Sequence, residues 1–160
     1  MSQPKRTARG PRPSSIARVP GIDYAELDTM FGYALKRAQV AAFEAFSRAT
    51  SGADITPPRF TALVILQTNP GISQSLLGDV LGTARSGAML LTDWLESRGL
   101  AERRHRPDDG RAWGLYLTPK GQRLTDTLRR RVRDHDRRFA ARIAPREQRE
   151  LLRLLQKLAR

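Results

Sequence analysis

Arginines gather around one short turn in the second half of the chain. The turn, at residues 107–110, holds Asp109, and four arginines lie beside it: Arg103, Arg104, Arg106 and Arg111. A guanidinium group donates paired hydrogen bonds to a phosphate or a guanine edge, and it also fits a narrow minor groove. We expect Asp109 to orient Arg111 through an ion pair. The alternative is a solvated surface pair, which contributes little to stability.

A second group of candidate residues lies earlier in the chain, over residues 73–89. Small side chains here would let a helix approach DNA closely, and Arg85 and Ser86 could bond phosphates or base edges. Alanine methyl groups could contact thymine. With the turn residues, the candidate DNA-binding set is Ser73, Gln74, Ala84, Arg85, Ser86, Gly87, Met89, Arg104, Arg106, Asp109 and Arg111.

The elements that must position these residues are two short helices and a hairpin. Ser73 is typical of a helix N-cap, Gly82 ends that helix, and a second helix is expected to run from about residue 84 to Gly99. Strand-like runs on both sides of the turn predict a β-hairpin. In a winged helix-turn-helix, the second helix enters the major groove, which is about 12 Å wide. An ordinary helical hairpin in an all-α domain is the alternative, and the charged hairpin argues against it.

Two longer helical segments flank this region. Apolar residues recur at spacings of three and four over about residues 23–50 and again over 119–160. These apolar stripes are longer than one small lobe can cover, so we expect a homodimer. The predicted fold is therefore mainly α with a small β-hairpin wing: a winged helix-turn-helix at about 55–118 between N- and C-terminal dimerisation helices, in a single domain over 21–160. A twofold dimer would place its recognition helices about 34 Å apart on a pseudo-palindrome.

The charge balance favours a polyanionic partner. Lysine and arginine total 29 against 16 acidic residues, a formal net charge of +13, which points to double-stranded DNA. Residues 1–20 lack acidic side chains and read as a disordered basic arm, either without a role or in contact with phosphates. The sequence shows no secretory signal and no membrane-spanning run, so we expect a cytoplasmic protein.

Catalysis and metal binding find no support in the residue types. The chain has no cysteine, which excludes disulfides, cysteine-ligated zinc and a thiol nucleophile. Two histidines, His105 and His135, lack metal-ligand spacing. There is no nucleophile elbow or phosphate-binding loop. We therefore expect neither an enzyme nor a cofactor.

Four stretches of the chain form a recognisable pattern: Gly-Asp-Val-Leu-Gly at 78–82, Asp-Trp-Leu-Glu-Ser-Arg-Gly-Leu-Ala-Glu-Arg at 93–103, Asp-Asp-Gly-Arg at 108–111, and Leu-Tyr-Leu-Thr-Pro-Lys-Gly at 115–121. Together they resemble the MarR family of bacterial regulators, over about residues 23–160. The resemblance implies a homodimer whose first and last helices interlock. It also implies a recognition helix at 84–98, a wing at 101–117, and an effector pocket between the dimer layer and the DNA-binding lobe.

An effector pocket would draw on aromatic and arginine side chains of the first two helices, which suit an aromatic ring bearing a carboxylate or phosphate. The resemblance suggests a phenolic acid or its coenzyme A thioester, and the arginine-rich stretch 129–142 could help to bind an anion. For each residue, a plain core role is the alternative. The candidate effector-binding residues are Phe31, Tyr33, Arg37, Phe43, Phe46, Arg59 and Phe60.

These features predict a ligand-responsive regulator, a repressor that a small aromatic effector releases from a palindromic operator, with aromatic catabolism as its target. A non-specific architectural DNA-binding protein is the competing reading, because the charge is high and the expected recognition helix has few polar side chains. The two differ in whether DNA binding depends on sequence.

Overall fold

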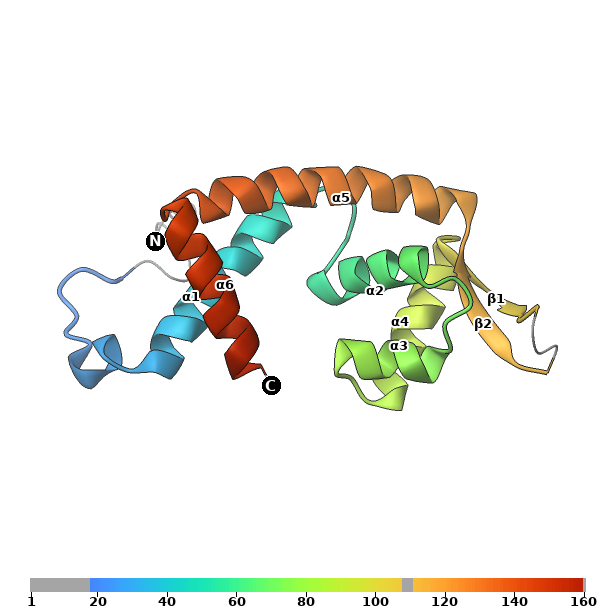
Figure 1. Ribbon diagram of the computed structural model, residues 1–160, viewed down its shortest axis with the longest axis horizontal. Coiled ribbons are helices and arrows are strands. Elements are labelled where there is room, and N and C mark those ends of the chain that lie inside the picture. Colours follow the sequence, from blue (N-terminus) through green and yellow to red (C-terminus); the bar gives the residue numbers. More distant parts are fainter. Residues whose placement is uncertain (1–17, 108–110, 160) are drawn as a thin grey trace, which may run out of the picture. The chain divides into compact units, whose positions relative to one another are not determined.

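Helices make up most of the protein. The computed structural model describes residues 18–107 and 111–159. In chain order these contain the 3-10 helix η1 (Ala25–Asp28), α1 (Phe31–Ala49), α2 (Pro57–Thr68), α3 (Gln74–Leu81), α4 (Arg85–Ser97), β1 (Ala101–His105), β2 (Trp113–Leu117), α5 (Pro119–Ala140) and α6 (Pro145–Leu158) (Figure 1). The two strands form an antiparallel hairpin. A mainly α fold with a β-hairpin wing is thus confirmed.

The chain divides into two compact units, the first ending at residue 44 and the second beginning at residue 45. In the first unit, the long helix starts at Phe31 and not at Asp23 as the apolar spacing predicted. Residues 25–28 form η1 instead, and just before it the Asp23 carboxylate accepts from the Ala25 amide at 2.9 Å. Side-chain bonds of this kind offer the backbone an alternative to helical pairing.

The second unit has one hydrophobic core, built by α2, α3, α4, β2 and α5. Each of these elements contributes at least one leucine whose side chain is almost fully buried. The largest buried apolar side chains are Leu63, Leu66, Leu77, Leu95, Leu115 and Leu128. Together with β1, the elements α2, α3, α4 and β2 form a lobe from which the hairpin projects (Figure 1). It contains the residues that the sequence predicts to bind DNA, and on that prediction we call it the DNA-binding lobe.

A tight turn joins α3 and α4. The Ser73 hydroxyl accepts from the Leu76 amide at 3.2 Å and so caps α3, as predicted. Gly82 ends α3 in the left-handed region, at φ 60°, where a residue with a Cβ atom is strained. A Cβ atom on Gly78 would lie 3.1 Å from the Cβ of Ala88, so α3 and α4 approach each other closely. The turn therefore holds the two helices in a helix-turn-helix arrangement.

The hairpin carries a short third segment that was not predicted from the sequence. Ile72 bridges to Leu115, with hydrogen bonds of 2.9 Å between their backbones and from the Gly71 amide to the Leu115 carbonyl. The approach is close enough that a Cβ atom on Gly114 would lie 2.8 Å from backbone atoms of Gly71. The segment just before α3 thus fixes the base of the hairpin to the lobe.

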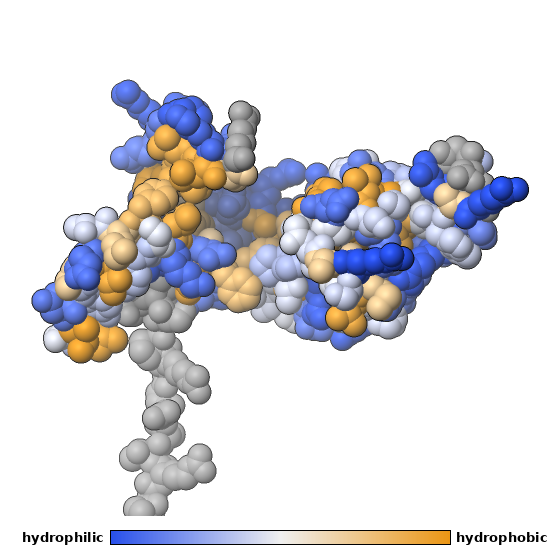
Figure 2. Space-filling model, turned by 90° about the horizontal axis from the view of Figure 1, so that it is seen from below, coloured by the Kyte–Doolittle hydropathy of each residue, from blue (hydrophilic) through white to orange (hydrophobic). Residues whose placement is uncertain are grey.

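The last helix, α6, is amphipathic, and its apolar face is exposed. Glu147 accepts a hydrogen bond from the Ala144 amide at the start of the helix, and Arg153 lowers the pKa of the Glu150 carboxyl by hydrogen bonding to it. Five leucines of this helix are 37–61% exposed: Leu151, Leu152, Leu154, Leu155 and Leu158. Apolar side chains at the molecular surface are visible in Figure 2. Within the described ranges, no helix is both long and apolar enough to cross a membrane.

Candidate nucleic-acid interface

Helix α4 presents one face to the core and the other to solvent. Ala88, Thr92 and Leu95 are buried, and they anchor the helix. Most of the predicted DNA-binding residues of this helix lie on the outward face: Ala84, Arg85, Ser86 and Met89 are exposed, and Gly87 is half-buried. Leu90 is 68% exposed on the same side. The outward face therefore offers few polar side chains, chiefly Arg85 and Ser86.

The N-terminus of α4 adds backbone donors to this face. Ala84 is the N-cap, and in the described part of the chain no side chain accepts a hydrogen bond from the first turn of α4. The first amides of a helix lack partners within the helix, and the helix dipole makes this end attractive to anions. A DNA phosphate at this end would satisfy these amides, while Arg85 supplies a positive charge beside them.

Arg103 joins three elements of the DNA-binding lobe. From the middle of β1, its guanidinium group forms a close ion pair with Glu96, reaches Asp93 at 2.9 Å, and donates to the Gln74 side-chain oxygen at 3.0 Å. Its backbone amide also donates to Glu96, at 3.0 Å. Arg103 therefore links the hairpin to α4 and to the start of α3.

This network changes the interpretation of two residues. Gln74, predicted to contact DNA, has its side-chain oxygen bonded to Arg103. Arg103 was noted in the sequence only as one of the arginines beside the turn, and it was not among the candidate DNA-binding residues. One feature of the sequence could have indicated this role of Arg103. Asp93 and Glu96 form an acidic pair, and Glu96 lies about one helical turn before the chain reverses at Gly99.

The exposed surface of the hairpin is basic and aromatic. Arg104 lies 4.1 Å from the ring centre of Tyr116 and pairs with Glu102 at 3.2 Å. His105 stacks on Trp113 across the strands, with ring centres 4.1 Å apart, and Trp113 is 56% exposed. The surface beside the hairpin tip is hydrophilic (Figure 2). These side chains make the hairpin suited to contact with a polyanion.

The remaining predicted wing residues lie next to the tip. Arg106 is half-buried, and its amide donates to the Ala112 carbonyl at 2.9 Å. Arg111 is exposed two residues before β2 begins. Asp109 lies outside the described residues, so the expected ion pair between Asp109 and Arg111 stays a prediction.

The predicted effector-binding residues fall into separate groups. In the first unit, Arg37 lies 5.8 Å from the ring centre of Tyr33, whereas Phe31 and Phe43 are 64% and 50% exposed. In the second unit, Phe46 and Phe60 pack edge to face, with ring centres 5.7 Å apart, against the hydrophobic core. The latter pair therefore also contributes to the core of the second unit.

Arg59 belongs to a different cluster. Its guanidinium group lies 3.8 Å from the ring centre of Trp94 and donates to the Asp54 carboxylate at 3.1 Å. Arg98 reaches the other carboxylate oxygen of Asp54, also at 3.1 Å, and lies 5.1 Å from the same ring. Arg59 therefore packs against Trp94 of α4.

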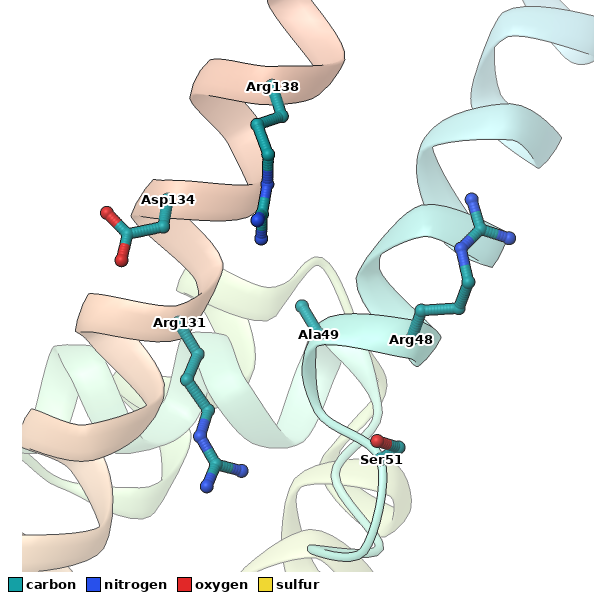
Figure 3. Close-up of a pocket in the computed structure, with 6 residues that line it drawn as sticks. All are labelled: Arg48, Ala49, Ser51, Arg131, Asp134 and Arg138. Carbon is teal, nitrogen blue, oxygen red and sulfur yellow. The ribbon is translucent and has the colours of Figure 1, made fainter.

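An open cleft of about 530 Å³ lies between the end of α1 and α5. Its lining residues are Arg48, Ala49, Ser51, Arg131, Asp134 and Arg138. The Arg131 and Arg138 side chains extend into the space beside Ala49, while the Asp134 carboxylate points away (Figure 3). Asp134 is also paired with Arg137. We call this the arginine cleft. The arginine-rich stretch 129–142 pointed to it, but its individual residues were not predicted.

Two short helices joined by a glycine turn, with an outward helix face and a basic projecting hairpin, define a winged helix-turn-helix DNA-binding protein. Residues 55–113 match the model of the MarR family. A Thauera aromatica protein named as a transcriptional regulatory protein for the hcr operon is 35% identical over 81% of this chain and 78% of its own length. The chain belongs to the MarR family and is a DNA-binding transcriptional repressor of that type.

Solved structures support the same assignment. The transcriptional repressor CouR bound to a 23-mer DNA duplex matches with a TM-score of 0.81 and 34% identity, over 87% of this chain and 99% of that one. CouR bound to p-coumaroyl-CoA matches with a TM-score of 0.78 and 33% identity, over 87% and 98%. The winged helix-turn-helix fold predicted from the sequence is therefore confirmed.

Proposed function

We propose that the protein binds a palindromic operator as a homodimer and is released by a small anionic aromatic effector. The observation that carries the proposal is the outward face of α4 with the basic hairpin beside it. Arg85 and Ser86 supply side-chain donors for the major groove, and Arg111 lies at the hairpin tip for the minor groove. The similarity to a DNA-bound CouR structure supports this use of the two elements.

The dimer is supported by apolar surface at both ends of the chain. Leu152 and Leu158 of α6 are 58% and 61% exposed, and Phe31 of α1 is 64% exposed. A helix whose apolar face is exposed in this way is typical of an interaction site. A twofold dimer would present two copies of α4 to successive turns of the major groove.

A phenolic acid or its coenzyme A thioester is the effector class that we propose, and genes of aromatic catabolism are the proposed target. CouR is similar to this chain and has been solved with p-coumaroyl-CoA. In this chain, aromatic side chains such as Phe46 and Phe60 could contact a ring, and Arg131 and Arg138 in the arginine cleft could bind acidic groups.

Release requires that the effector bind better to a dimer that does not match the operator. A coupling free energy of about 3 kcal/mol would lower operator affinity by roughly 150-fold. The test titrates the dimer with p-coumarate and with p-coumaroyl-CoA, by calorimetry and in operator-binding assays. We expect one of them to bind and to weaken the operator complex. If neither binds nor changes DNA affinity, this effector class is rejected.

A non-specific architectural role is the second candidate. It is favoured by the outward face of α4, where Met89 and Leu90 are 48% and 68% exposed and polar readout rests on few side chains. Such a protein would bind random duplexes as tightly as any defined site. Comparing a palindromic duplex with a scrambled one of equal length separates the two candidates.

A further inference from the structure

The connector between α1 and α2 is tied to the C-terminal end of the recognition helix. Asp54 in this connector accepts hydrogen bonds from Arg59 and from Arg98, each at 3.1 Å. Both guanidinium groups lie against the ring of Trp94, at 3.8 Å and 5.1 Å from its centre. Trp94 belongs to α4, and Arg98 is the residue that ends it. One carboxylate thus aligns two cations that hold the indole ring of Trp94.

The backbone on either side fixes the position of Asp54. The Thr50 hydroxyl, which is buried, contacts the carbonyls of Phe46 and Ile55 at 3.1 Å and 3.3 Å. Ile55 is buried in the core of the second unit. Asp54 itself has a left-handed backbone, at φ 49°, so its side chain leaves the connector in one defined direction. The connector therefore offers a fixed point against which α4 can be held.

The length of α4 makes the position of its N-terminal end sensitive to small movements at its C-terminal end. Arg85 and Trp94 are nine residues apart, which is about 13 Å along a helix. A tilt of about 10° around Trp94 would move Arg85 by about 2 Å at that length, and hydrogen bonds to base edges tolerate only a few tenths of an ångström. A small change at the C-terminal end would therefore disrupt DNA contacts at the N-terminal end.

We propose that Asp54 is a positioning residue for operator binding: through Arg59 and Arg98 it holds Trp94 and thereby sets the direction of α4. The proposal rests on the proposed operator-binding function. Asp54 does not need to touch DNA for this role. Ser51, three residues earlier in the same connector, lines the arginine cleft, so the connector joins that cleft to the recognition helix.

The test uses Asp54→Asn, because the change in charge and the loss of positioning predict opposite effects on operator affinity. The substitution raises the formal net charge from +13 to +14, and added positive charge tightens binding to any DNA. Asparagine adopts left-handed backbone readily, so the connector is preserved. The Asp54 and Arg98 side chains are 58% and 53% exposed, so solvent screens much of their ion pair. We therefore expect about three- to fivefold weaker binding to the palindromic operator, with unchanged or tighter binding to a scrambled duplex, at a temperature where the variant is folded.

Asp28→Asn is the matched control. It removes the same charge and also breaks an arginine ion pair, with Arg18 in the first unit. We expect it to leave the preference for operator over scrambled duplex unchanged. Operator binding by Asp54→Asn that equals or exceeds that of the wild-type protein would overturn the proposal. Asp54→Glu, which keeps the carboxylate, should recover part of the lost operator affinity.

A spectroscopic readout tests the link without DNA. The protein has two tryptophans, so a Trp113→Phe background reports Trp94 alone. Asp54→Asn should shift the Trp94 emission to longer wavelength as the guanidinium groups move off the ring. An unchanged spectrum would refute the link. A different result would be a shifted spectrum together with equal binding of the wild-type protein to operator and scrambled duplex. In that case the proposed operator-binding function is wrong, and so is the positioning role in operator binding. The link from Asp54 through the two arginines to Trp94 would still hold.

Discussion

Arg103 shows how one side chain can organise a DNA-binding surface without being its main contact. Its side chain is 30% exposed, and the side chain of its partner Glu96 is 28% exposed. Replacing it with alanine would leave Asp93 and Glu96 facing one another without a cation. We expect Arg103→Ala to lower the free energy of unfolding by about 1.5–3 kcal/mol, the range for hydrogen bonds to charged groups. Denaturant unfolding measures this.

Arg104 supplies the comparison for that experiment. It is an arginine of the same strand, but its side chain is 54% exposed and its partner Glu102 is 48% exposed. Exposed ion pairs of this kind contribute at most about 1 kcal/mol. If Arg104→Ala destabilised the protein as much as Arg103→Ala, the linking role of Arg103 would be wrong.

Arg111 should act on DNA binding and not on folding. If it makes a specific contact in the minor groove, Arg111→Ala should weaken operator binding by about 1–3 kcal/mol, while surface substitutions change stability by less than about 0.5 kcal/mol. Mobility-shift titrations at several salt concentrations would measure the affinity and its salt slope. Arg133→Ala, which removes an exposed arginine from α5, is the control. An unchanged affinity and salt slope for Arg111→Ala would reject its role.

At the scale of the elements, two glycines that shape the lobe, Gly82 in the turn after α3 and Gly114 in β2, are required for different reasons. Gly82 has φ 60° and open space around it, whereas a Cβ atom on Gly114 would collide with the backbone of Gly71 at 2.8 Å. We expect Gly82→Ala to cost about 1 kcal/mol through backbone strain, and Gly114→Ala to cost more, up to about 3 kcal/mol, through overpacking. Thermal and denaturant unfolding compare them. Equal costs would contradict this account of the hairpin base.

The elements were predictable from the sequence where their signals were local. Ser73 caps α3 as its position suggested, and Thr118 caps α5 in the same way; such caps are local signals because a cap and its partner amide lie within three residues. The links that position these elements were not predictable. The Asp54–Arg98 bond spans 44 positions and the Gln74–Arg103 bond spans 29, and nothing in the composition of either segment specifies its partner.

The late start of α1 and the residues of the arginine cleft were missed for different reasons. Near the start of α1, the Asp23 carboxylate accepts a hydrogen bond from the Ala25 amide, a local bond that apolar spacing alone does not reveal. The cleft gathers Arg48 and Ser51 with Arg131 and Arg138, which are distant in the chain. Periodicity identifies which face of a helix is apolar, but not which other segment meets it.

At the scale of the whole molecule, the central expectation is a dimer held by the two ends of the chain. Leu151 and Leu155 lie one turn apart on the exposed face of α6. Replacing both with glutamate would place charges in an apolar interface, where burial is costly. We expect the double variant to be monomeric in sedimentation experiments and to bind the operator far more weakly. A variant that stays dimeric would show that α6 does not form the interface.

The most direct test of the whole account is a footprint on the DNA that flanks the gene. A homodimeric reader of sequence should protect one discrete pseudo-palindrome, with half-site centres about one helical turn, or about 34 Å, apart. A scrambled duplex of the same length should bind at least about a thousandfold more weakly at physiological salt. Uniform protection along the duplex, with equal affinity for scrambled DNA, would contradict the account.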